Sequence, residues 1–149
     1  MSLMMRKVFT SVYVLLTAFA LAMSTGANAE QKKTLGEWDI HYMVVNTPFL
    51  TPEVASRYGI VRSKYNALVN ISVLDTSSKE AQRVSVSGTA RNLLGNTKTL
   101  TFKKVEDGDA IYYLAVVPFR DQETFQFAID VQKGNNAQKL TFKQKMYVD

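Results

Sequence analysis

One histidine and one methionine are the residues whose types and spacing best fit a chemical role. His41 is the single histidine of the chain, and Met43 follows it by two residues. In an extended strand, residues two apart point to the same face. Imidazole and thioether groups are donors that copper accepts, so His41 and Met43 are a candidate metal pair. The alternative is an ordinary structural pair, because neither a His-x-x-x-His motif nor an acidic cluster accompanies them.

Catalytic motifs are missing from the sequence. Acyl transfer needs a nucleophile beside a base, and His41 would have to be that base in a chain without cysteine. Neither a Gly-x-Ser-x-Gly nucleophile elbow nor a Gly-x-x-x-x-Gly-Lys phosphate loop occurs. The paired carboxylates of Asp107 and Asp109 fall in an evident turn, where solvated acidic residues are ordinary. We therefore expect no catalytic residues and no cofactor, and a hydrolase is the third choice of function.

Alternation of apolar and polar residues predicts β-strands, and one of these strands carries His41 and Met43. The period of two recurs through the chain after residue 30, and short Gly-, Asn- and Asp-containing segments separate the runs. The predicted strands cover 38–44, 67–73, 84–90, 99–103, 110–117, 124–131 and 140–148. Of these, 110–117 is nearly continuously apolar, which predicts a central strand covered on both faces. Seven strands in about 120 residues favour an all-β fold, an immunoglobulin-like β-sandwich of antiparallel strands, although the paired cysteines of antibody domains are absent. Residues 31–33 are expected to be a short exposed leader.

One long early loop, residues 46–64, breaks this pattern and predicts a short helix. Thr51 can cap the free backbone amides, Pro52 suits the first helical position, and Gly59 can end the helix in a left-handed conformation. The four-residue spacing of Leu50, Val54 and Tyr58 places them on one stripe, which we expect to pack against an end of the sandwich.

The same loop is also a candidate binding surface. An excursion of this length is unusual in a compact domain, and long excursions often carry binding work. The candidate partner-binding residues are Phe49, Arg57, Tyr58, Arg62 and Lys64. From the sequence alone, the segment reads either as a binding loop or as a structural plug.

The first 29 residues have the pattern of an export signal. Arg6 and Lys7 precede an uncharged run of 16 residues, 8–23, and Ala27-Asn28-Ala29 suits signal peptidase. An uncleaved anchor is the alternative, but it needs roughly 20 apolar residues. We expect a signal peptide over 1–29 and a single domain over 30–149, located in the periplasm of a Gram-negative host.

Charge and cysteine content limit the partners of the exported domain. Without Arg6 and Lys7, the 18 Lys plus Arg fall to 16, against 13 Asp plus Glu. Such a small excess disfavours nucleic acid, whose binders concentrate many cations on one face. Without cysteine the chain is not a lipoprotein, so we expect no stable membrane anchor after signal cleavage. The oligomeric state is left open.

Several sequence blocks resemble a known family of exported bacterial proteins. The blocks are Gly36-x-Trp38-x-x-His41-Tyr42, Phe49-Leu50-Thr51-Pro52-x-Val54-Ala55-x-x-Tyr58-Gly59-Ile60-x-Arg62-Ser63-Lys64, Leu68-x-Asn70-Ile71-Ser72-Val73-Leu74, Gly88-Thr89-Ala90-x-Asn92-Leu93-Leu94-Gly95 and Asp109-Ala110-Ile111-Tyr112-Tyr113. Together they make the chain similar to domain-of-unknown-function family 4426 over essentially the whole exported part. The resemblance implies a small periplasmic β-sandwich with no assigned reaction.

These observations lead to two functional hypotheses. The first is a noncatalytic interaction module of the cell envelope that binds a protein or peptide through residues 46–64 or an exposed strand edge. The second is a carrier of copper or a small ligand that uses His41 and Met43.

Overall fold

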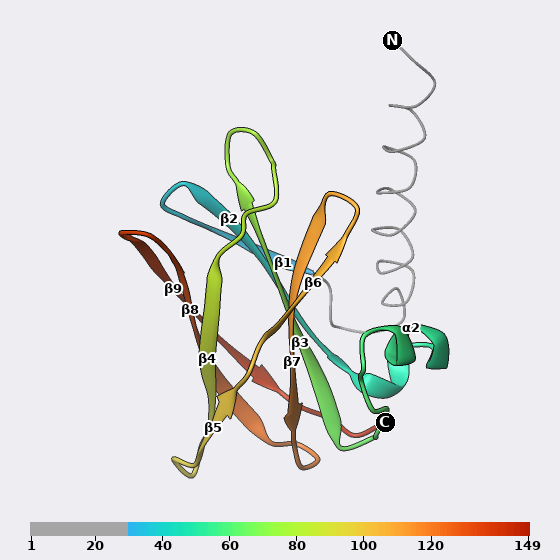
Figure 1. Ribbon diagram of the computed structural model, residues 1–149. Coiled ribbons are helices and arrows are strands. Elements are labelled where there is room, and N and C mark those ends of the chain that lie inside the picture. Colours follow the sequence, from blue (N-terminus) through green and yellow to red (C-terminus); the bar gives the residue numbers. More distant parts are fainter. Residues whose placement is uncertain (1–29) are drawn as a thin grey trace.

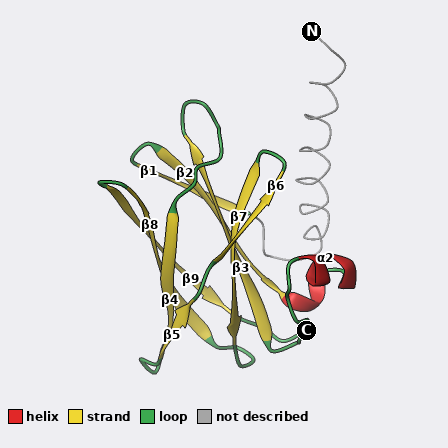
Figure 2. Ribbon diagram, in the orientation of Figure 1, coloured by secondary structure: helices red, strands yellow, loops and turns green. Residues whose placement is uncertain are grey.

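The computed structural model describes residues 30–149, which form a β-sandwich of nine strands with two short helical segments (Figures 1 and 2). The elements are β1 (Gln31–Leu35), β2 (Trp38–Asn46), the 3-10 turn η1 (Thr47–Phe49), α2 (Pro52–Arg57), β3 (Asn66–Asp75), β4 (Ser85–Asn92), β5 (Thr97–Leu100), β6 (Lys103–Asp107), β7 (Ala110–Pro118), β8 (Thr124–Lys133) and β9 (Asn136–Lys145). The predicted signal peptide lies outside the described residues. Within them, no helix has the length and apolar character needed to cross a membrane.

Two antiparallel sheets form the layers of the sandwich. The first sheet has the strand order β1-β2-β3-β7-β6, and the second has the order β5-β4-β8-β9. The order β2-β3-β7-β6 matches the A-B-E-D sheet of an immunoglobulin domain, and β4-β8-β9 matches its C-F-G sheet. The predicted fold class is therefore confirmed, with β1 added at one edge and β5 at another.

The strand count and some boundaries differ from the prediction. Residues 31–33 are exposed, as expected, but they are no leader, because they belong to β1, which pairs with β2 in register. The single strand predicted over 99–103 is divided, since β5 ends at Leu100 in the second sheet and β6 begins at Lys103 in the first. The last strand, β9, starts four residues earlier than expected and ends at Lys145. The sequence did not predict β1, because an exposed edge strand has mostly polar residues and therefore little alternation of apolar and polar side chains.

The main core fills the space between the sheets. Alternate residues of β2, β3 and β7 face alternate residues of β4, β8 and β9, as the period of two requires. Aromatic rings occupy its centre: the centroid of the Phe142 ring lies 4.8 Å from that of Phe127 and 4.5 Å from that of Tyr42. The single tryptophan, Trp38, is also buried there.

A second, smaller core lies on the outer face of the first sheet. Met43, Val45 and Leu68 are buried on that face although they point away from the other sheet. The cover comes from the predicted excursion, in which Leu50, Ala55 and Ile60 are buried and Val54 and Tyr58 pack against the cluster. The predicted apolar stripe is thus real, but its expected place was wrong, because it packs on the outer face of the first sheet, near one end of the sandwich, and not across that end.

The helix itself begins and ends as the sequence indicates. Thr51 is the N-cap, and its side-chain oxygen accepts a hydrogen bond from the Val54 amide at 3.2 Å. Pro52 is the first helical residue, and Gly59 has a φ of +68°, which favours glycine.

Candidate functional site

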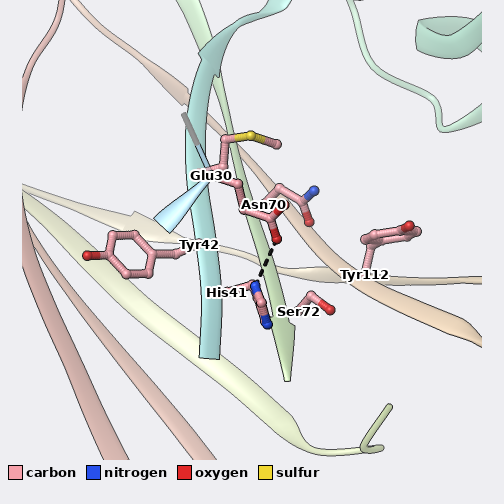
Figure 3. A pocket seen from close by; sticks show the side chains of 7 residues that line it. Glu30, His41, Tyr42, Asn70, Ser72 and Tyr112 are labelled. Carbon is pink, nitrogen blue, oxygen red and sulfur yellow. Dashed lines mark ion pairs between the residues drawn. The ribbon is translucent and has the colours of Figure 1, made fainter. Parts of the chain in front are cut away.

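A small hollow opens on the outer face of the first sheet, beyond the part that the excursion covers (Figure 3). Its volume is about 40 Å³. Its lining residues are Glu30, His41, Tyr42, Met43, Asn70, Ser72 and Tyr112. We call it the outer-face hollow. The register explains the gathering, since His41 pairs with Ser72 and Met43 pairs with Asn70 across β2 and β3.

An imidazole–carboxylate pair stands at the rim of the outer-face hollow. The Nδ1 atom of His41 lies 3.0 Å from Oε1 of Glu30, and both side chains remain partly exposed (Figure 3). Glu30 reaches His41 because it directly precedes β1, whose first residue pairs with Tyr42. A carboxylate that accepts the proton of one ring nitrogen orients the imidazole and leaves the other nitrogen as a donor to a ligand.

Asn70 supplies the unusual polar atom of this hollow. The residue is 7 % exposed, and its Oδ1 is buried without a hydrogen-bond partner among residues 30–149. Buried polar atoms are nearly always paired, because an unpaired one costs free energy. An orphaned carbonyl oxygen beside His41 is therefore a place for a cation or a hydrogen-bond donor.

The electrostatics of the hollow also favour positive charge. Burial, followed by the nearby Tyr58, Asp107 and Glu30, raises the pKa of Tyr112 to about 12. Its phenol therefore stays protonated and neutral at ordinary pH. Of these neighbours, Tyr58 is a neutral phenol, and only the carboxylates of Asp107 and Glu30 attract a cation.

The available donors fit a soft metal better than a hard one. Residues 30–149 contain no group of three or more His, Cys, Asp or Glu side chains arranged to hold a metal ion. The lining of the outer-face hollow contains one imidazole, one carboxylate and the thioether of Met43, which is buried there. Thioether and imidazole ligation suits copper, whereas calcium and magnesium require several oxygen ligands.

Asp39 lies on the same sheet face and has a structural role. Its carboxylate is buried and accepts hydrogen bonds from Thr34 Oγ1 at 2.7 Å, Thr76 Oγ1 at 3.0 Å and Lys79 Nζ at 2.8 Å. The Lys79 ammonium and the two hydroxyls hold the pKa of this carboxyl well below its usual range. The network joins β1, β2 and the β3–β4 loop. Sequence reasoning missed it, because Asp39 reads there as the polar member of an alternating strand.

Of the five candidate partner-binding residues, three occupy separate settings. Phe49 is 38 % exposed at the end of η1. Arg62 donates a hydrogen bond from Nη2 to the Pro48 carbonyl at 3.0 Å, so it holds the loop together. The Nζ atom of Lys64 lies 5.1 Å from the centre of the Tyr65 ring.

The remaining two, Arg57 and Tyr58, share a shallow open hollow with strand β6. Its volume is about 420 Å³, and residues 103–107 form the other wall. Tyr58 is half-buried, and burial followed by the Asp107 carboxylate raises its pKa. The excursion therefore combines a buried plug with a polar outer rim.

Comparisons with known proteins place the chain in a family and a fold. The family model described as "Domain of unknown function (DUF4426)" matches residues 32–149. A crystal structure of a DUF4426 family protein from Pseudomonas aeruginosa is 37% identical, with a TM-score of 0.71, over 80% of this chain and 96% of that one. No curated protein matches significantly.

Two more distant structures share the fold. Both are of FetP from uropathogenic Escherichia coli. The protein as isolated after recombinant expression in the periplasm is 12% identical, with a TM-score of 0.59, over 80% of this chain and 95% of that one. A copper-bound glutamate-to-glutamine variant is 11% identical, with a TM-score of 0.57, over 81% of this chain and 92% of that one.

Proposed function

This chain belongs to the DUF4426 family of domains of unknown function, and we propose that it is a noncatalytic carrier of copper at the outer-face hollow. The observation that carries the proposal is the approach of Glu30 to His41 in the same hollow as the buried Met43. From the sequence, His41 and Met43 formed an isolated pair. The strand pairing adds the carboxylate and the unpaired oxygen of Asn70.

Each residue has a distinct role in this proposal. Met43 supplies a thioether and His41 an imidazole nitrogen, the two donors that select copper over harder cations. Glu30 orients the imidazole through Nδ1, and its negative charge attracts a cation to the hollow. Copper is the cargo of the site, and the protein's part is to hold it on a rigid sheet.

The same architecture also occurs in a copper-bound structure. FetP, which has been crystallised as a copper-bound variant, has this sandwich at low sequence identity. That likeness concerns the architecture alone, and the argument for copper here rests on the residues of the outer-face hollow.

Competition for Cu(I) against a chelator of known affinity tests the proposal. The chain from Glu30 to Asp149 should bind with a dissociation constant below about 1 μM, and Met43→Leu should weaken binding about tenfold or more. Met146→Leu is the matched control, because Met146 is also buried but lies in the core between the sheets. Binding weaker than micromolar, or equal loss in both variants, contradicts the copper role.

We also infer a second role, binding of an envelope protein or peptide at the rim of the excursion. Exposed Phe49 and the open hollow beside Arg57 favour it, because an aromatic side chain next to a cation is a common anchor of protein interfaces. Affinity recovery from periplasm, with wild type beside Phe49→Ala/Arg57→Ala, tests this role. A protein enriched only by the wild type supports it, and equal recovery by both removes it. Arg83→Ala, at the opposite end of the sandwich, is the control.

We also propose that the protein works in the periplasm. The signal pattern in residues 1–29 supports this location, and cleavage after Ala29 would make Glu30 the first residue of the exported protein. Intact mass of the exported protein tests the cleavage, since a chain that still starts at Met1 contradicts it.

A further inference from the structure

The exposed apolar side chains of the described chain gather at one end of the sandwich. This basal end consists of loops 47–65, 93–96 and 119–123 and the tail 146–149, which all lie toward the bottom of Figure 1. The exposed large hydrophobic residues are Phe49, Val61, Tyr65, Leu93, Leu94, Val116 and Tyr147. Six of the seven lie in those segments, and Val116 is two residues before β7 ends. The opposite loops of the described chain, 36–37, 76–84, 108–109 and 134–135, expose none.

Two leucines project furthest. Leu93 is 77 % exposed and Leu94 is 88 % exposed, at the tip of the β4–β5 hairpin. Adjacent leucines at a turn are unusual, because turn positions ordinarily carry polar residues or glycine. Neither side chain contributes to either hydrophobic cluster, so packing within the fold does not explain them.

The tip that presents the leucines is an ordered turn. The Asn92 Oδ1 atom accepts hydrogen bonds from the backbone amides of Leu94 at 3.0 Å and Asn96 at 2.9 Å. The Asn92 Nδ2 atom donates to Glu123 Oε2 at 3.0 Å, which ties the hairpin to the neighbouring β7–β8 loop. The structure therefore holds both leucines outward at little further entropic cost on binding.

Positive charge accompanies these apolar groups. Together with two flanking residues on each side, the segments of the basal end (45–67, 91–98, 117–125 and 144–149) contain seven Lys and Arg against four Asp and Glu. Two of the acidic residues hold the loops together through hydrogen bonds. Asp121 accepts a hydrogen bond from the Val148 backbone amide, and Glu123 accepts one from the Arg120 backbone amide. The opposite loops with the same flanks (34–39, 74–86, 106–111 and 132–137) contain three Lys and Arg against seven Asp and Glu. The basal end is thus cationic relative to the rest.

The tyrosines of the basal end carry lysines on their faces. Lys64 Nζ lies 5.1 Å from the ring centre of Tyr65, and Lys145 Nζ lies 5.5 Å from that of Tyr147. Tyrosine combines an apolar ring with a polar hydroxyl, which suits the boundary between water and lipid, and lysine ammonium groups bind lipid phosphates there.

We propose that the basal end docks reversibly on an anionic lipid bilayer, with Leu93 and Leu94 inserted among the acyl chains and the lysines and arginines at the headgroups. Apolar side chains on separate protruding loops fit a fluid bilayer better than the packed surface of a protein partner, which requires one contiguous complementary patch. The lysine and arginine excess selects anionic over neutral lipid. This is surface attachment, distinct from a spanning segment.

Vesicle co-sedimentation tests the proposal on the chain from Glu30 to Asp149, which contains every described strand and both hydrophobic clusters. Vesicles of equal parts phosphatidylglycerol and phosphatidylcholine should retain it, and vesicles of pure phosphatidylcholine should retain much less. Leu93→Ser/Leu94→Ser should lower the partition coefficient roughly tenfold per leucine, because each loses the free energy of apolar burial. Both side chains are exposed, so this variant should unfold like the wild type.

Charge-reversal variants distinguish docking through the basal end from a general electrostatic attraction between the protein and anionic lipid. Arg91→Glu, beside the tip, should weaken binding to the anionic vesicles severalfold, whereas Lys133→Glu, near the opposite end, should change it little. No retention on anionic vesicles, or retention unaffected by the double serine variant, overturns the proposal and leaves the basal end to a protein partner.

Discussion

Leu50→Ala tests whether the excursion is a structural plug. Leu50 is 6 % exposed and packs in the second core with Met43 and Leu68. Removal of its isopropyl group forfeits about 2 kcal/mol of apolar transfer free energy, at about 0.8 kcal/mol per methylene. The cavity left behind brings the total to about 3 kcal/mol, within the range for buried leucines.

Urea unfolding monitored by tryptophan fluorescence is the assay. Trp38 is the single tryptophan and lies in the main core, so it reports global unfolding without contact with the altered site. A loss of about 3 kcal/mol should lower the urea midpoint by roughly 1–2 M with an unchanged slope. Leu93→Ala is the matched control, because the same atoms are removed from an exposed site and the loss should stay within about 0.5 kcal/mol.

The result that refutes the reasoning is equal stability of the two variants. A loss below about 1 kcal/mol for Leu50→Ala would mean that the excursion does not stabilise the outer sheet face. The large loss should also weaken copper binding, because Met43 is shared by the second core and the outer-face hollow.

Two further predictions concern the sheets. Gly88→Ala should destabilise by about 2 kcal/mol in the same urea assay, because a Cβ at Gly88 would lie 2.7 Å from the Ala128 carbonyl oxygen; wild-type stability would show that the strands separate easily. Asp39→Asn should flatten the acid limb of a plot of melting temperature against pH. The depressed pKa of Asp39 means that its stabilisation is present above the ordinary pKa of 3.8 and is lost as pH falls toward the folded value, so an unchanged limb would contradict the network.

Local pattern predicted much of this molecule from the residues alone. Alternation along 38–44 and 67–73 placed Ile40 and Val69 correctly toward the core, because a strand's period of two separates its faces. The helix in the excursion was equally readable, since Thr51 and Pro52 act through their own backbone neighbourhood. The same alternation placed His41 and Met43 on one face of their strand.

The partners of those residues depend on pairings between distant strands. Glu30 reaches His41 because β1 pairs with β2. The sequence did not predict β1, because it has too little alternation of apolar and polar residues. Asn70 looked like an ordinary polar strand residue until the register set it opposite Met43. Local propensity does not encode which strands pair, because that choice follows from burial summed over the whole core.

What the sequence by itself determined is therefore the class of fold, most of its strands and the short helix, because periodicity, caps and turns act within a few residues. Only the tertiary structure decided that the excursion covers the outer face of the first sheet, and that the exposed leucines and tyrosines share one end. These features depend on contacts between residues far apart in the chain. Such contacts stabilise the fold only once the sheets have packed.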